Sequence, residues 1–165
     1  MKEITSLEKR PKTTYNVRFQ DCDPMGHLNN SRYIDYVLNA REDHLETYYE
    51  MRLRDFIAKG YGWVVSNHEI FYLKPAVYNE KVKIQTSVID LGNDSIIVEG
   101  LIMNEEETHC KALVWTRYVY VNIKTGKREN YERDLQDFFT NIKNEGVNIH
   151  EGIKLRLKQL FDRTL

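Results

Sequence analysis

One short segment of the sequence concentrates the residue types that carry out chemistry. It runs from residue 18 to residue 33 and contains two carboxylates, a histidine and two amides, which are Asp21, Asp23, His27, Asn29 and Asn30. If an extended backbone continues as far as Asp23, the alternation of side chains along a strand places Asp21 and Asp23 on one face and Cys22 on the other. A carboxylate in such a loop can act as a general base or as a nucleophile.

The elements on either side of this loop would position its side chains. Apolar residues at helical spacing predict a helix from Asn30 to near Glu50, with Asn29 or Asn30 as the N-cap. The backbone N–H groups at the positive end of this helix would point back toward the loop, where they could polarise a carbonyl oxygen. A carboxylate that faces such an oxyanion site suits the hydrolysis of an acyl compound.

The remaining pattern predicts an α+β protein. Alternation over 13–20, with Tyr15, Val17 and Phe19 on the buried side, predicts a first strand, and a second, short helix is expected over 53–59. Runs of β-branched and aromatic residues predict four more strands, at 63–74, 80–91, 95–104 and 109–123. The short turns between them imply antiparallel neighbours. The tail 131–165 is expected to be helical in two pieces.

Composition narrows the class of protein. A chain of 165 residues fits a single domain, 1–165, and 41% hydrophobic with 30% charged residues is typical of a soluble protein. A formal net charge of -1 provides no basic excess for nucleic acid, and no apolar run reaches the roughly 20 residues that a membrane-spanning helix needs. Cys22 and Cys110 cannot form a disulfide framework for a chain of this size, so we expect a reducing, cytoplasmic location.

The loop also carries a recognisable motif. It has the form Asp-x-Asp-x-x-Gly-His-x-Asn-Asn followed by x-x-Tyr, and the residues that fit are Asp21, Asp23, Gly26, His27, Asn29, Asn30 and Tyr33. This pattern resembles the hotdog-fold thioesterases of the 4-hydroxybenzoyl-CoA thioesterase type, and more closely their bacterial acyl-CoA thioesterase branch. The segment Tyr72-Leu73-Lys74-Pro75-Ala76 matches a strand-to-turn segment of that family. The resemblance covers about residues 13–130.

The resemblance implies both a fold and a reaction. The fold would be an antiparallel sheet of five to six strands wrapped around a long central helix. The sheet would extend across a homodimer, or within a homotetramer made of two such dimers, and the acyl chain would bind between subunits. The reaction would release a free carboxylic acid and coenzyme A from an acyl-CoA without a metal or another cofactor. The implied catalytic groups are Asp23, the backbone N–H of Asn30 and His27, and the implied substrate-binding residues are Asp21, Asn29, Tyr33 and Lys74.

Several alternatives stay open at the level of sequence. The thiol carrier could be acyl carrier protein instead of coenzyme A, or the chain could be a non-catalytic module that binds acyl thioesters. Asp21 could serve the loop backbone as an Asx-turn residue, and Cys22 could act as a thiol nucleophile. A calcium loop is excluded, because Met25 and Arg32 occupy ligand positions. The basic residues of the tail, Lys154, Arg156 and Lys158, are expected on a solvated face.

Overall fold

The computed structural model describes residues 7–162, with side chains to residue 160. The elements in chain order are β1 (Lys12–Asn16), η1 (Phe19–Asp21), α1 (Arg32–Tyr49), α2 (Leu53–Ala58), β2 (Tyr61–Tyr72), β3 (Lys81–Leu91), β4 (Ser95–Asn104), β5 (Cys110–Asn122), α3 (Arg133–Ile142), η2 (Ile149–Glu151) and α4 (Gly152–Asp162). The four strands that follow α2 lie within two residues of their predicted bounds.

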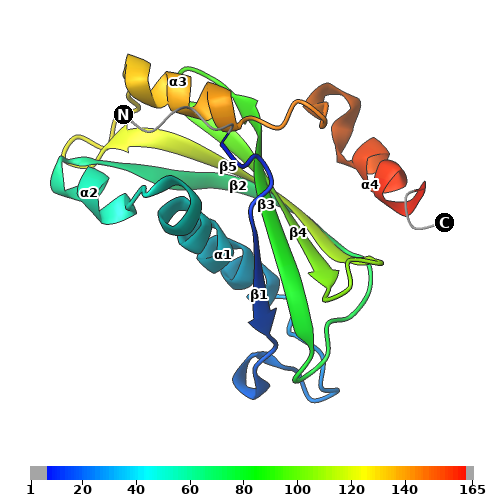
Figure 1. Ribbon diagram of the computed structural model, residues 1–165. Coiled ribbons are helices and arrows are strands. Elements are labelled where there is room, and N and C mark those ends of the chain that lie inside the picture. Colours follow the sequence, from blue (N-terminus) through cyan, green and yellow to red (C-terminus); the bar gives the residue numbers. More distant parts are fainter. Residues whose placement is uncertain (1–6, 163–165) are drawn as a thin grey trace.

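The five strands form one antiparallel sheet in the order β1-β3-β4-β5-β2. Helix α1 packs on one face of this sheet, and Figure 1 shows the strands curving past it. The predicted α+β arrangement, an antiparallel sheet around a long helix, is confirmed. The loop between β1 and α1 and the turn between β2 and β3 meet at the lower end of the molecule in Figure 1.

The core between α1 and the sheet follows from the apolar stripe of the helix. Tyr33, Val37 and Ala40 are buried against strand residues such as Ile84 and Ile102. Strand β4 carries Gly100 where α1 packs closely on the sheet. A side chain does not fit there, because a Cβ atom on Gly100 would lie only 2.5 Å from Val37 Cγ1. A larger residue there would push the helix away from the sheet.

Two predicted boundaries were wrong. The first strand ends at Asn16 and not at Gln20, since β3 begins only at Lys81 and offers no partner beyond that point. The chain then forms the short 3-10 helix η1, which leaves Phe19 78% exposed where the alternation predicted burial. Helix α1 begins at Arg32, two residues after the predicted start, with Ser31 as its N-cap.

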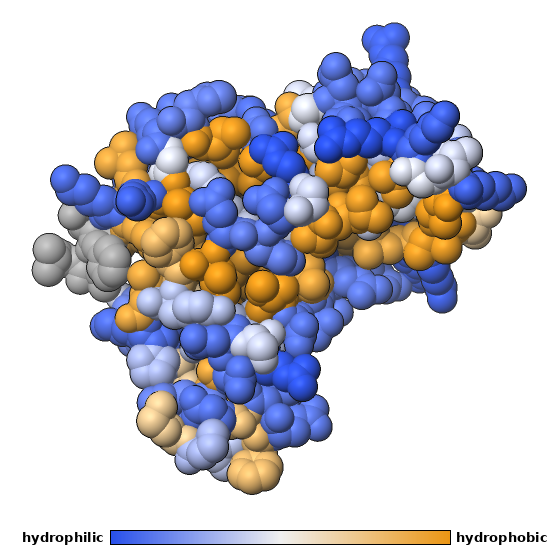
Figure 2. All heavy atoms as spheres, turned by 180° about the vertical axis from the view of Figure 1, so that it is seen from behind, coloured by the Kyte–Doolittle hydropathy of each residue, from blue (hydrophilic) through white to orange (hydrophobic). Residues whose placement is uncertain are grey.

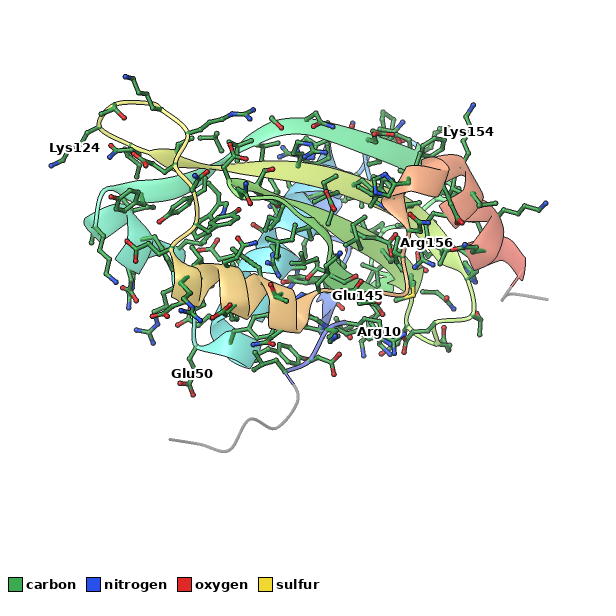
Figure 3. The ribbon with its side chains drawn as sticks, turned by 90° about the horizontal axis from the view of Figure 1, so that it is seen from above. Arg10, Glu50, Lys124, Glu145, Lys154 and Arg156 are labelled. Carbon is green, nitrogen blue, oxygen red and sulfur yellow. The ribbon has the colours of Figure 1, made fainter. Side chains whose placement is uncertain are left out.

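The predicted helical tail is present, and its second helix lies on the face of the sheet opposite α1. Arg156 on α4 is buried and holds Glu99 of β4 through two charge-assisted hydrogen bonds, of 2.9 and 2.8 Å. Trp115 Nε1 donates a third hydrogen bond to the same carboxylate at 3.0 Å. Figure 3 shows Lys154 pointing away from the strands, whereas Arg156 lies over them. The expectation that Arg156 belongs to a solvated face was therefore wrong.

The two edges of the sheet differ. The edge strand β1 has outward backbone carbonyls that accept hydrogen bonds from α1, with Tyr48 Oη donating to Lys12 O at 3.1 Å and Tyr36 Oη to Asn16 O at 3.5 Å. The other edge strand, β2, pairs only with β5, and its residues 64–67 are exposed. Figure 2, the view from behind, shows hydrophobic surface across the middle and upper parts of the molecule and a mainly hydrophilic lower end.

Candidate active site

The loop that precedes α1 is fixed by its own backbone and by the turn after β2. Asp23 N–H donates to His27 O at 2.8 Å and Gly26 N–H to Asp23 O at 2.9 Å, which closes a tight turn. Gly26 has a φ of 77°, a left-handed conformation that glycine adopts without strain. Leu28 N–H donates to Ala76 O and Tyr78 N–H to Gly26 O, both at 2.8 Å. The loop before α1 and the 73–80 turn therefore form one unit.

Asp23 uses one carboxylate oxygen to hold this loop. Its Oδ1 accepts the backbone N–H groups of Met25 at 2.9 Å and of His27 at 3.1 Å. Its Oδ2 has no hydrogen-bond or ion-pair partner within residues 7–162. The Asx-turn role considered for Asp21 therefore falls to Asp23, and a second carboxylate oxygen remains free for chemistry.

Asn30 carries an unpaired backbone N–H at the start of α1. The preceding carbonyl, Asn29 O, accepts the N–H of Arg32 at 2.8 Å, so this carbonyl is directed into the first turn of the helix. Because the peptide unit is planar and trans, the Asn30 N–H points the opposite way, out of the helix end. It makes no hydrogen bond within the described part of the chain. Such an N–H at the positive end of an 18-residue helix can stabilise a developing oxyanion.

The side chains of the two asparagines differ from prediction. Neither is the N-cap, although Asn29 Oδ1 accepts the Ser31 N–H at 3.0 Å and so satisfies a donor just ahead of the helix. The backbone carbonyl of Asn30 accepts the hydroxyl of Tyr72 at 2.9 Å. This last contact ties the end of β2 to the start of α1, and the sequence pattern gave no signal for it.

A groove of about 480 Å³ brings most of the predicted site residues together. Six of the seven candidates line it, namely Asp23, His27, Asn29, Asn30, Tyr33 and Lys74, together with Tyr72 and Pro75. Tyr33 is anchored in the wall, where its hydroxyl accepts the Ala76 N–H at 3.1 Å, and burial raises its pKa. Lys74 is exposed at the rim. The groove thus combines a free carboxylate oxygen, a free backbone N–H and a cation.

Asp21, the seventh candidate, lies outside this groove. Because η1 replaces the predicted strand, Asp21 turns toward α1, where Tyr36 Oη donates to its Oδ2 at 2.8 Å. The guanidinium of Arg32 lies 3.8 Å from its other oxygen. The two loop aspartates therefore do not share one face, contrary to the expectation from alternation.

Cys22 is poorly suited to act as a nucleophile. Its Sγ donates to the backbone carbonyl of Arg18 at 3.3 Å. Burial, with smaller contributions from the Asp21 and Asp23 carboxylates, raises the pKa of its thiol and disfavours the reactive thiolate. The geometry of the loop therefore favours the carboxylate over the thiol.

A second, apolar pocket of about 410 Å³ lies between α1, α2 and the start of β2. Leu38, Leu45, Trp63 and Phe139 are among the residues that line it, and so is the guanidinium-bearing Arg41. Arg41 matches an arginine position of the family that the sequence resembles, although the sequence assigns it no role. Its position, four residues after Val37 and four before Leu45, places it on the buried stripe of the helix and was the available signal.

Within residues 7–162 no group of three His, Cys, Asp or Glu side chains is arranged to hold a metal ion. Over the same residues, the helices are all too short or too polar to cross a bilayer.

Comparison with solved structures identifies the architecture. The chain resembles a 1,4-dihydroxy-2-naphthoyl-CoA thioesterase from Synechocystis, with a TM-score of 0.72, 16% identity and coverage of 84% of this chain and 99% of that one. It also resembles YbaW, a probable thioesterase from Escherichia coli, with a TM-score of 0.70, 28% identity and coverage of 81% and 98%. The protein thus has the hotdog fold predicted from its motif, with a groove suited to thioester hydrolysis.

Sequence comparison then identifies the family. The chain is 29% identical over 126 residues to the long-chain acyl-CoA thioesterase FadM of Escherichia coli (strain K12), which covers 76% of this chain and 94% of FadM. The model of the Thioesterase-like superfamily matches residues 17–139. This protein belongs to the Thioesterase-like superfamily and is a thioester hydrolase.

Proposed function

We propose that this protein hydrolyses acyl-CoA thioesters, with Asp23 as the catalytic carboxylate and the Asn30 N–H as the oxyanion donor. The observation that carries the proposal is that Asp23 and Asn30 line the same groove, while Asp23 Oδ2 and the Asn30 N–H have no partner within residues 7–162. Membership of a thioesterase family and the similarity to FadM, a long-chain acyl-CoA thioesterase, support coenzyme A as the thiol carrier.

The chemistry follows from these two groups. Asp23 Oδ2 takes a proton from a water molecule while the water oxygen attacks the thioester carbon. The carbonyl electrons move to oxygen, where the Asn30 N–H stabilises the negative charge. Collapse of this intermediate breaks the carbon–sulfur bond, and the leaving thiolate takes up the proton that Asp23 received from water. In the alternative route Oδ2 attacks the thioester carbon itself and the thiolate leaves as the anhydride forms. Water then hydrolyses the anhydride, which releases the acid and restores the carboxylate.

The other groove residues have supporting roles in this proposal. His27 and Asn29 shape the loop and its wall, and Lys74 at the rim offers a cation to the phosphates of coenzyme A. Asp21 makes no direct substrate contact in this proposal, because it lies outside the groove. There its carboxylate accepts a hydrogen bond from Tyr36 and lies near the guanidinium of Arg32. The same exposed Lys74 would suit an acidic acyl carrier protein, which is the alternative thiol carrier.

We also propose that the working form is a homodimer joined along β2. This strand has 12 residues and one unpaired edge, and Val64 and Val65 on it are exposed. The polar groove lies at the Tyr72 end of β2 and the apolar pocket at its Trp63 end. If two copies pair antiparallel along β2, the groove of one would face the apolar pocket of the other, which would receive the acyl chain. The free thiols of Cys22 and Cys110 suit a cytoplasmic location.

The proposal is tested by thiol release from a panel of short, long and aromatic acyl-CoA thioesters and from one acyl-acyl carrier protein. The decisive variant is Asp23→Asn, in which Oδ1 can still accept the Met25 and His27 N–H groups while the basic Oδ2 is lost. We expect kcat to fall by about 100-fold or more.

The matched control is Asp21→Asn, which removes a neighbouring carboxylate that lies outside the groove. It should change kcat far less than Asp23→Asn does. Equal activity of Asp23→Asn and the native protein would refute the mechanism. If only the carrier-protein thioester is hydrolysed, the thiol carrier is acyl carrier protein and not coenzyme A. If no thioester of the panel is hydrolysed, the protein is better explained as a module that binds acyl thioesters without catalysis.

A further inference from the structure

The apolar pocket contains a buried positive charge without a counter-charge. Arg41 is 6% exposed, and its guanidinium makes no hydrogen bond or ion pair with any residue in the described range 7–162. Burying a charged group without a partner is unfavourable, and natural proteins pair or hydrogen-bond such groups. An arginine left in this state inside a pocket indicates that its partner is absent from the structure.

The groups around Arg41 do not supply that partner. Glu42 also lines the pocket, but it is exposed, and adjacent residues on a helix point in different directions. The polar groups coupled electrostatically to Arg41 are Tyr118, Tyr49, Tyr131 and His44, and none of them is negatively charged at ordinary pH. Burial lowers the pKa of Arg41, an effect that a bound anion would oppose. The Tyr118 hydroxyl also has no hydrogen-bond partner within the described residues and lines the same pocket.

The rest of the pocket is suited to an apolar body. Its walls are formed by Leu38, Leu45, Leu53, Ile57, Val64 and Ile123. A volume of about 410 Å³ falls in the range of roughly 300–1,000 Å³ that is typical of small-molecule sites. Apolar walls with one cation and one hydroxyl match a molecule that has an apolar chain and a carboxylate at one end.

We propose that this pocket binds an amphiphilic carboxylate, with the carboxylate paired to Arg41 and the apolar chain against the surrounding aliphatic side chains. Arginine is suited to this role, because its planar fork can donate two parallel hydrogen bonds to a carboxylate. Binding of the ligand stands independently of catalysis, whereas the origin of the ligand rests on the proposed function. The carboxylate belongs either to a released fatty acid or to the far end of an acyl group on the substrate.

Binding is tested with decanoate and 1-decanol, two probes with the same chain length, by isothermal titration calorimetry at pH 7.5. We expect saturable binding of decanoate that is at least about tenfold tighter than that of decanol. Arg41→Met should remove this preference, whereas Arg133→Met, on an arginine that is 93% exposed, should retain it. The comparison of the two probes on the native protein needs no variant and remains decisive if Arg41→Met fails to fold.

Two results would overturn the proposal. In the first, decanoate binds the native protein no more tightly than decanol does. In the second, the Arg41→Met variant folds and still prefers decanoate to the same extent. Either result stands apart from the proposed function, because neither depends on turnover.

Kinetic measurements distinguish the two sources of the carboxylate, the released fatty acid and the far end of the acyl group. Decanoyl-CoA is compared with the ten-carbon acyl-CoA that carries a second, terminal carboxylate. A preference for the dicarboxylic substrate that Arg41→Met abolishes would assign the site to the acyl group. Inhibition by free decanoate, lost in Arg41→Met, would assign it to the released product. If neither effect appears in an active enzyme, the link between this site and the reaction is refuted.

Discussion

Asp23 uses only one of its two carboxylate oxygens to hold the loop. Oδ1 accepts two backbone N–H groups of the loop, Oδ2 has no partner within residues 7–162, and the residue lines the groove. The sequence resemblance named seven candidate site residues, and six of them line the groove. It could not predict the separate place of Asp21, because this depends on the 3-10 turn η1 and on a hydroxyl from Tyr36, fifteen residues further along the chain.

The Asn30 N–H can be removed without disturbing a protein hydrogen bond. Asn30→Pro deletes this donor, which has no partner within residues 7–162, and we expect kcat to fall by about 100-fold to 1,000-fold. Asn30→Ala is the matched control, because it changes the side chain and retains the backbone N–H. The measurement is thiol release, with circular dichroism to confirm that both variants fold. If kcat falls equally in the two variants, this N–H is not the donor that stabilises the oxyanion.

His44 should make the fold sensitive to mild acid. It is fully buried, its Nδ1 lies 2.7 Å from Thr86 Oγ1, and its Nε2 is unpaired. Burial, with a smaller effect of the Arg41 charge, lowers its pKa to about 4. In the unfolded chain the imidazole is therefore protonated as the pH falls below about 6.5, whereas in the folded chain it is protonated only near pH 4. Stability from this group is present above pH 6.5 and is lost as the pH falls between these values, by up to about 3 kcal/mol.

This effect is measured as the free energy of unfolding in denaturant at several pH values from 7 to 4.5. His44→Phe should flatten the decline relative to the native protein, and His150→Phe, at an exposed position, should leave it unchanged. A native protein and a His44→Phe variant with parallel pH profiles would show that His44 is not the titrating group.

At the scale of elements, the distance between α1 and the sheet is set by Gly100. Gly100→Ala places a Cβ atom 2.5 Å from Val37 Cγ1, and we expect a loss of about 1–3 kcal/mol in unfolding free energy. Gly62→Ala is the control, since its Cβ would meet the flexible Ile123 side chain at 3.4 Å. The free energy of unfolding of both variants is measured by chemical denaturation. If Gly100→Ala is as stable as the native protein, α1 can move away from the sheet without a loss of stability.

Most elements could be predicted from sequence because their residue types and spacing are distinctive. The strands β3 and β4 are runs rich in β-branched residues, the long α1 follows a helical pattern, and turn residues mark their ends. The errors fell where tertiary pairing decides. Val17 alternates like a strand residue, but the chain leaves the sheet after it, since β3 starts at Lys81. The burial of Arg156 was invisible because its partner, Glu99, lies 57 residues away.

At the scale of the whole molecule, the tail is held to the outer face of the sheet by apolar packing, with Ile153 in its core, and by one buried ion pair. Arg156→Met leaves Glu99, which is 0% exposed, without its cation, and we expect about 3 kcal/mol lower stability and faster proteolysis around residues 143–151. Lys154→Met, on the exposed side of α4, is the control. Replacing both Glu99 and Arg156 by Met should recover much of the loss. If Arg156→Met resists protease as the native protein does, apolar contacts alone hold α4.

The unequal edges of the sheet limit how far it can grow. A second chain that pairs along β2 in antiparallel fashion uses the same strand on both copies, so the interface is satisfied after two chains. Continued growth would require another chain to add at β1, where Tyr48 and Tyr36 already occupy outward carbonyls of Lys12 and Asn16. In the proposed dimer, growth would therefore stop at the pair, and a long edge strand would serve assembly without extending into a fibre.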